Sequence, residues 1–95
     1  LIHYAMTKGA IHSLTYGMAK ELGVYGIRVN GVAPGLIDTE IHAKAGDASR
    51  VEKLLPSVPL SRVGSPKEVA DTVMWLLSSK SSYVCGTIIK ISGGR

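Results

Sequence analysis

The segment that begins at Ser65 constrains the local fold more than any other part of this 95-residue chain. Ser65 suits a helix N-cap, Pro66 suits the first helical position, and Glu68 completes a capping box. The apolar positions that follow have helical spacing and predict a buried stripe: Val69, Val73, Leu76 and Leu77. The pattern therefore predicts a helix that ends at about Ser79.

Two segments on either side of this helix are typical of strands. Ile27–Ala33 includes alternating apolar and polar residues and stops at Pro34-Gly35, and Thr87–Ile91 lies between Gly86 and Gly93-Gly94. A strand, a helix and a strand in this order form a βαβ unit with parallel strands. Because two strands alone do not make a stable sheet, we expect a piece of a larger α/β fold.

Composition argues against several classes of function. Eleven Lys and Arg exceed seven Asp and Glu, for a net charge of +4, but no two basic residues are adjacent, so no nucleic-acid partner is expected. No apolar run approaches the ~20 residues of a membrane span. A single cysteine, Cys85, excludes an internal disulfide and suits a reducing compartment, so we expect a cytoplasmic protein. His3, His12 and His42 match no metal-ligand spacing, so no metal is expected.

A first helix is expected from Tyr4 to Leu22, followed by the glycines Gly23 and Gly26. Tyr4 and Lys8 are four residues apart, so their side chains point the same way. A phenol has a pKa of about 10, and an ammonium group at about 4 Å can lower it by roughly three units. Lys8 at this spacing would make Tyr4 usable as an acid or base near neutral pH, although a simple surface pair is the alternative.

The Tyr4 and Lys8 pair continues an apolar stripe of the same helix. The stripe consists of Ile11, Thr15, Met18 and Leu22. A chargeable pair at the end of a buried face needs partners, which makes it a candidate site. The alternative is an amphipathic helix whose first turn emerges into solvent.

Four motifs follow one another along the chain: Tyr4–Ala10, Ile27–Gly35 with Thr39, Pro59–Ala70, and Tyr83–Thr87 with Gly93-Gly94. Together they resemble the C-terminal part of a short-chain dehydrogenase/reductase. The resemblance implies the C-terminal part of a doubly wound, Rossmann-type parallel sheet with flanking helices, so residues 1–95 would be the C-terminal segment of one NAD(P)-binding domain. The phosphate-binding turn and the catalytic Ser and Asn of the family are not in this sequence, so we expect no activity from it alone.

The resemblance implies an NAD(P)-dependent oxidoreductase that moves a hydride between NAD or NADP and a carbonyl or alcohol substrate. In the family pattern, Tyr4 corresponds to the general acid/base. Lys8 corresponds to the residue that binds the nicotinamide ribose and lowers the pKa of the tyrosine, in agreement with the electrostatic argument. A non-enzymatic cofactor-binding protein or an interaction module of the same fold are the alternatives.

The resemblance also implies cofactor contacts after the first strand. Pro34-Gly35 and the backbone near Ile37 would form the wall beside the nicotinamide, and the Thr39 hydroxyl would lie near the carboxamide. Each has a purely structural alternative, because Pro34-Gly35 can be a turn and Thr39 can cap a helix.

Residues 36–63 show no clean periodicity, and a segment of this length is more often functional than idle. They resemble the substrate loop region, with Glu40–Pro56 as its mobile part, and Lys44–Leu55 is expected to form a short helix. The family further implies a homodimer or homotetramer. Three apolar residues of the first helix would serve either a core or that interface: Ile11, Leu14 and Met18.

Overall fold

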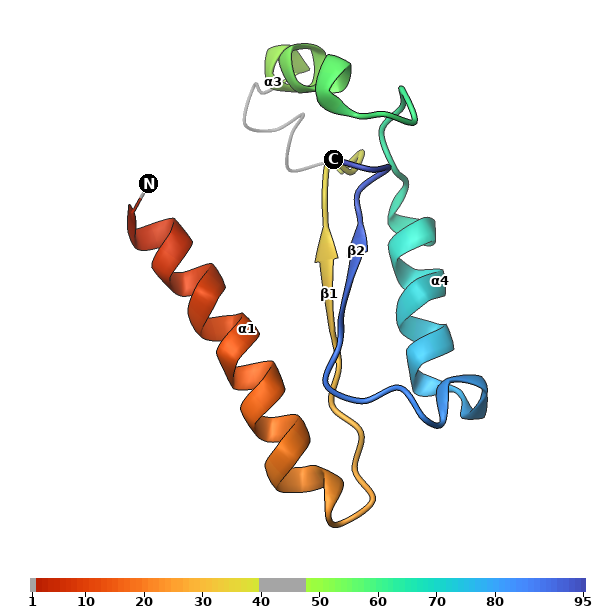
Figure 1. Ribbon diagram of the computed structural model, residues 1–95. Helices are drawn as coiled ribbons and strands as arrows, with labels where there is room; N and C mark the ends of the chain where they lie inside the picture. Colours follow the sequence, from red (N-terminus) through yellow and green to blue (C-terminus); the bar gives the residue numbers. More distant parts are fainter. Residues whose placement is uncertain (1, 40–47) are drawn as a thin grey trace.

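The structure is a computed structural model that describes residues 2–39 and 48–95. Figure 1 shows two short strands with a long helix on one side and a shorter helix on the other. The elements in chain order are α1 (Ile2–Gly23), β1 (Gly31–Pro34), α3 (Ala48–Leu54), the 3-10 turn η1 (Leu55–Ser57), α4 (Pro66–Leu77), the 3-10 turn η2 (Ser79–Ser81) and β2 (Ile88–Ile91).

The two strands pair in parallel, with Gly31 opposite Ile88 and Pro34 opposite Ile91. Because α4 lies between them in sequence, the predicted βαβ unit is confirmed. In Figure 1, α3 lies beyond the carboxyl ends of both strands, at the end of the molecule to which the first turns of α1 also point. In parallel α/β sheets, this is the end at which ligands bind.

The predicted capping box at the start of α4 is present. The Ser65 hydroxyl accepts a hydrogen bond from the Glu68 N–H at 3.2 Å, and the Glu68 carboxylate accepts one from the Ser65 N–H at 3.1 Å. The helix ends at Leu77 rather than at Ser79, because Ser78 turns to an extended conformation. Leu77 is 73% exposed, so its place in the predicted buried stripe was wrong: it lies one 100° step from the buried Leu76.

The first strand is shorter than the sequence predicted. It begins at Gly31 rather than at Ile27, because the partner chain turns away before β2, where Gly86 has a φ of +81°. The backbones still touch there, since the Gly86 N–H donates to the Val29 carbonyl at 2.8 Å. Continuous pairing starts where the Gly31 N–H donates to the Thr87 carbonyl, at 2.9 Å.

Before β1, side chains of two residues that were predicted to belong to the strand make hydrogen bonds to the neighbouring backbone. The Arg28 guanidinium donates to the Leu76 carbonyl at 2.8 Å and to the Ser78 carbonyl at 3.3 Å, near the C-terminal end of α4. It also donates to the Val84 carbonyl at 3.1 Å. The Asn30 amide donates to the same Val84 oxygen at 2.9 Å. The arginine and the asparagine therefore hold the end of α4 and the chain before β2 against the start of β1.

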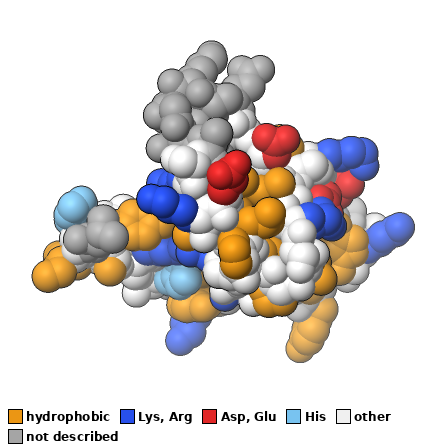
Figure 2. All heavy atoms as spheres, turned by 90° about the horizontal axis from the view of Figure 1, so that it is seen from above, with side chains coloured by type: hydrophobic (Ala, Val, Ile, Leu, Met, Phe, Trp, Pro, Cys, Tyr) orange, Lys and Arg blue, Asp and Glu red, His pale blue; other side chains and the backbone are white. Residues whose placement is uncertain are grey.

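Helix α1 faces the strands with Thr15 and Ala19, which are buried. The predicted stripe was right for Thr15 and wrong for Ile11 and Met18, which are 56% and 37% exposed. Ile11 borders a cavity between α1 and β1, so the strand does not cover it closely. Figure 2 shows that hydrophobic side chains also protrude at several places on the face seen from above.

Helix α3 confirms the short helix expected within Lys44–Leu55, although residues 44–47 lie outside the described residues, as do His42 and the first part of Glu40–Pro56. Buried side chains of Leu36, Ile37 and Val58 gather near the carboxyl ends of the strands. None of the helices within residues 2–39 and 48–95 combines the length and apolarity that crossing a membrane requires.

Candidate active site

Tyr4 and Lys8 lie together in the first two turns of α1. The Lys8 Nζ stands 5.6 Å from the centroid of the Tyr4 ring, within the range of a cation–π contact. The Tyr4 side chain is 59% exposed, so the phenol is accessible to a reactant. The helical spacing therefore gives the close approach that the sequence predicted.

The carboxyl end of β1 forms the opposite wall of a cleft beside this pair. The cleft has a volume of about 480 Å³, and Tyr4, Lys8, Pro34 and Gly35 all line it. A smaller cavity of about 220 Å³ continues from the same pair along α1 and β1, toward Thr15. The structure thus brings together four of the six site residues predicted from the sequence.

Ile37 and Thr39, the other two predicted site residues, do not line the 480 Å³ cleft. The Ile37 side chain is 7% exposed and lines a separate cavity of about 200 Å³ between β2 and the start of α4. Thr39 is half-buried at the edge of the described chain. Because the Ile37 side chain lines this other cavity, a contact of Ile37 with a ligand in the 480 Å³ cleft would have to involve its backbone.

Three basic residues that the sequence patterns did not single out share the cleft with Lys8: Arg50, Lys90 and Arg95. The Lys90 Nζ donates to the Arg95 backbone carbonyl at 3.1 Å. No acidic residue from the described chain lines this cleft. The signal in the sequence was Lys90, which interrupts the otherwise apolar strand Ile88–Ile91.

A metal centre has no support in the described residues, since no group of three or more His, Cys, Asp or Glu side chains lies close enough to hold an ion. The chemistry available at the cleft is that of a phenol, of ammonium and guanidinium groups, and of the backbone at the end of β1. These groups can exchange a proton and can hold the hydroxyls of a polyol such as ribose.

Residues 2–95 match the sequence model of a family described as enoyl-(acyl carrier protein) reductase. The chain belongs to the short-chain dehydrogenase/reductase family, of which it matches the C-terminal portion. It is 47% identical over 94 residues to YgfF, an uncharacterized oxidoreductase of Escherichia coli. The match covers 99% of this chain and 38% of that protein. It is 45% identical over 92 residues to the 3-oxoacyl-[acyl-carrier-protein] reductase FabG of Thermotoga maritima, and this match covers 97% of this chain and 37% of that protein.

Solved structures show the same fold. A provisionally assigned 2-deoxy-d-gluconate 3-dehydrogenase from Agrobacterium tumefaciens, with bound NADP, matches with a TM-score of 0.87 at 34% identity. The match covers 96% of this chain and 37% of that chain. The α/β fold with a parallel sheet is therefore that of this family, and the chain spans a little more than a third of the length of these relatives.

Proposed function

We propose that residues 1–95 supply the C-terminal part of the active site of an NAD(P)-dependent oxidoreductase, completed by the N-terminal part of the family fold. The assembled protein is called the complete enzyme below. The observation that carries the proposal is the cleft of about 480 Å³ in which Tyr4 and Lys8 on α1 face Pro34-Gly35 at the end of β1. The membership of the chain in a family of oxidoreductases supports the same assignment.

Tyr4 is proposed as the general acid/base. In carbonyl reduction its phenol donates a proton to the substrate oxygen, and in alcohol oxidation the phenolate accepts the proton from the hydroxyl. The exposed position of its side chain at the cleft supports this role.

Lys8 is proposed to act on both the tyrosine and the cofactor. Its ammonium group near the Tyr4 ring stabilises the phenolate, and its remaining N–H groups can donate to the hydroxyls of a ribose. Bound NAD or NADP would supply or accept the hydride at the substrate carbon. The cleft has room for part of such a ligand, and its four basic side chains and lack of described acidic ones suit an anionic dinucleotide.

The wall beside the nicotinamide is proposed to consist of Pro34, Gly35, the Ile37 backbone and the Thr39 hydroxyl. Pro34 and Gly35 line the cleft directly. Ile37 and Thr39 follow on the same segment, which leaves β1 toward the end of the sheet where α3 lies (Figure 1). Residues 36–63 would then be the substrate loop region, and its substrate would be a small molecule with a carbonyl or alcohol group.

The complete enzyme is further proposed to be a homodimer or homotetramer. On α1, the apolar side chains of Ile11 and Leu14 are 56% and 60% exposed, and Met18 is 37% exposed. An exposed apolar face of this kind is suited to burial against the rest of the enzyme or a second copy. Size-exclusion chromatography with light scattering on the complete enzyme measures the oligomeric state directly.

The substitution Tyr4→Phe tests the catalytic proposal, because it removes the exchangeable proton and keeps the ring. Turnover of the complete enzyme should fall by about 10²–10⁴-fold, with NAD(P)H binding largely kept. Tyr16→Phe on the same helix is the matched control and should leave turnover unchanged. A Tyr4→Phe enzyme with near-native turnover would exclude Tyr4 as the acid/base.

A further inference from the structure

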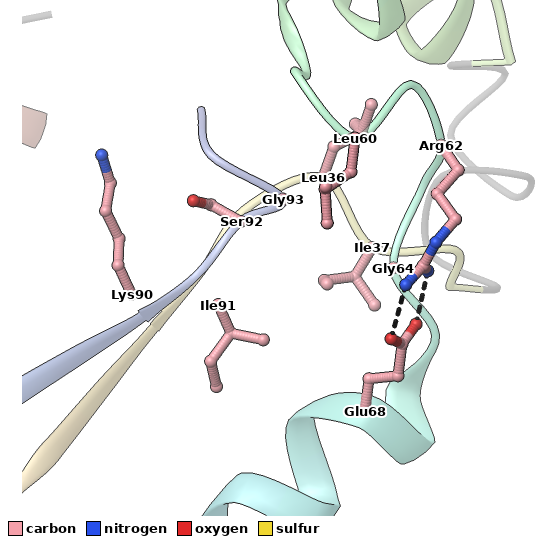
Figure 3. A pocket seen from close by; sticks show the side chains of 10 residues that line it. All are labelled: Leu36, Ile37, Leu60, Arg62, Gly64, Glu68, Lys90, Ile91, Ser92 and Gly93. Atoms are coloured by element: carbon pink, nitrogen blue, oxygen red, sulfur yellow. Dashed lines mark hydrogen bonds and ion pairs between the residues drawn. The ribbon is translucent and has the colours of Figure 1, made fainter.

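The segment that leaves β1 is fastened to the residue just before the α4 cap. The Gly64 N–H donates to the Leu36 carbonyl and the Asp38 N–H donates to the Gly64 carbonyl, both at 2.9 Å. Ile37 and Gly64 thus form a parallel β-bridge outside the two strands. Figure 3 shows Ile37 and Gly64 side by side above the first turn of α4.

This bridge fixes which way the Ile37 backbone points. In a parallel bridge, the partner residue bonds to the groups on either side of its opposite number, here Leu36 and Asp38. The N–H and C=O of Ile37 itself therefore point away from Gly64. The bridge therefore directs both backbone groups of Ile37 to the side away from Gly64, where a ligand can meet them.

An ion pair joins residues on either side of Gly64. The Arg62 guanidinium donates two hydrogen bonds to the Glu68 carboxylate, at 2.7 and 2.9 Å (Figure 3). Glu68 belongs to the capping box of α4, so the pair ties the residues on both sides of Gly64 to a rigid helical turn. Through Gly64, the position of Ile37 therefore depends on α4, whereas Tyr4 and Lys8 lie on α1.

A side chain at position 64 would press on Ile37. A Cβ built on Gly64 would stand 2.8 Å from the Ile37 Cδ1, closer than such contacts occur. Ile37 is 7% exposed, so its neighbours limit how far the terminal methyl group can turn aside. A Cβ at position 64 is therefore expected to strain the Ile37–Gly64 bridge.

We propose that Gly64 is a positioning residue for the cofactor: by pairing with Leu36 and Asp38, it sets where the Ile37 backbone and Thr39 meet the nicotinamide. This inference rests on the proposed function, and it adds a residue that does not touch the ligand. We call the bridge of Gly64 to Leu36–Asp38, together with the Arg62–Glu68 ion pair, the Gly64 latch.

The test is a double-mutant cycle in the complete enzyme, with Gly64→Ala, Ile37→Val and the double variant. Valine lacks the Cδ1 that the new Cβ would meet, so it relieves the contact selectively. NAD(P)H affinity is measured by fluorescence, and the face of hydride transfer by stereospecifically 4-deuterated NAD(P)H. Gly64→Ala should weaken NAD(P)H binding about tenfold and allow hydride transfer from both faces of the nicotinamide ring. Adding Ile37→Val to Gly64→Ala should restore most of the lost affinity.

Gly86→Ala is the matched control, because Gly86 lies at the other end of the strands with a φ of +81° and little room for a Cβ. It should lower the melting temperature at least as much as Gly64→Ala and leave the affinity and the face of transfer unchanged. Additive effects in the cycle, or the same loss of affinity in Gly86→Ala, would overturn the latch while the proposed function stands. Absence of NAD(P)H binding by the unsubstituted enzyme would overturn both.

Discussion

Gly35 and Ser92 approach each other so closely that no side chain fits at position 35. A Cβ on Gly35 would stand 2.9 Å from the Ser92 Cα and 2.8 Å from its Cβ. The Gly35 N–H meanwhile donates to the Ile91 carbonyl at 2.8 Å, which continues the pairing of the strands by one residue. This contact fixes the end of β1, and with it the wall of the cleft that faces Tyr4 and Lys8.

Gly35→Ala should therefore destabilise the complete enzyme by about 1–3 kcal/mol, because the obstacle includes backbone that cannot rotate away. Thermal and urea unfolding measure the loss, and NAD(P)H affinity should fall with it, since the cleft wall moves. Gly9→Ala on α1 is the control: apart from the neighbouring turns of the helix, no described atom lies within 4 Å of its Cβ position, and alanine favours a helix by roughly 0.5–1 kcal/mol. A Gly35→Ala enzyme as stable as the parent would contradict the close contact.

Lys8→Met should weaken NAD(P)H binding by the complete enzyme, because the proposed hydrogen bonds from its ammonium group to the ribose are lost. A fluorescence titration measures the change in affinity. Lys20→Met, near the other end of α1, should leave the affinity unchanged. A Lys8→Met enzyme with the affinity of the parent would exclude Lys8 as a cofactor-binding residue.

The Glu68 carboxylate should make stability depend on pH in the acid range. Hydrogen bonds from Arg62 and from the Ser65 N–H lower the pKa of Glu68 from 4.5 to about 2. Since the folded value is the lower one, the stabilising contribution is complete well above pH 4.5 and is lost as the pH falls through about 2. Glu68→Gln removes the charge, so the stability difference between parent and variant should shrink over this interval.

Urea unfolding of the complete enzyme and the Glu68→Gln variant at several pH values measures this difference. Glu21→Gln on α1 is the charge-matched control for the loss of one carboxylate. A parent–variant difference that stays constant between about pH 6 and pH 3 would show that the ion pair with Arg62 does not persist in solution.

The 95 residues expressed alone should neither fold cooperatively nor bind the cofactor tightly. The sheet of the described chain has two strands, and large apolar side chains such as Ile2, Met6 and Leu14 are at least 60% exposed on α1. A structure with so little buried surface is marginal. Circular dichroism should show broad melting, with no saturable change in NAD(P)H fluorescence. A sharp transition with micromolar binding would contradict this prediction.

Local signals in the sequence predicted several elements closely. The capping box located the start of α4, and the four-residue spacing of Tyr4 and Lys8 placed both side chains together, because each signal depends on neighbours within one helical turn. The family motifs likewise indicated the fold that the comparisons show. The cofactor roles of Pro34, Gly35 and the residues after them stay predictions.

Signals that depend on distant partners were predicted less well. The strand was expected from Ile27, but continuous pairing begins at Gly31, because the partner chain turns at Gly86. In the same way, the exposure of Ile11 and Met18 depends on which side of α1 meets the strands. Helical periodicity can group residues on a face, but it does not say what covers that face.

The sequence by itself determined the type and order of the elements and the pairing of Tyr4 with Lys8, since these rest on backbone preferences and short-range contacts. Only the tertiary structure showed that Gly35 has no room beside Ser92, and that Gly64 bridges to the Leu36–Asp38 segment. Both contacts join residues 26 or more positions apart, and a glycine in the sequence does not identify its neighbour in space. Long-range packing therefore decided how the end of β1 is held in position to form the candidate site.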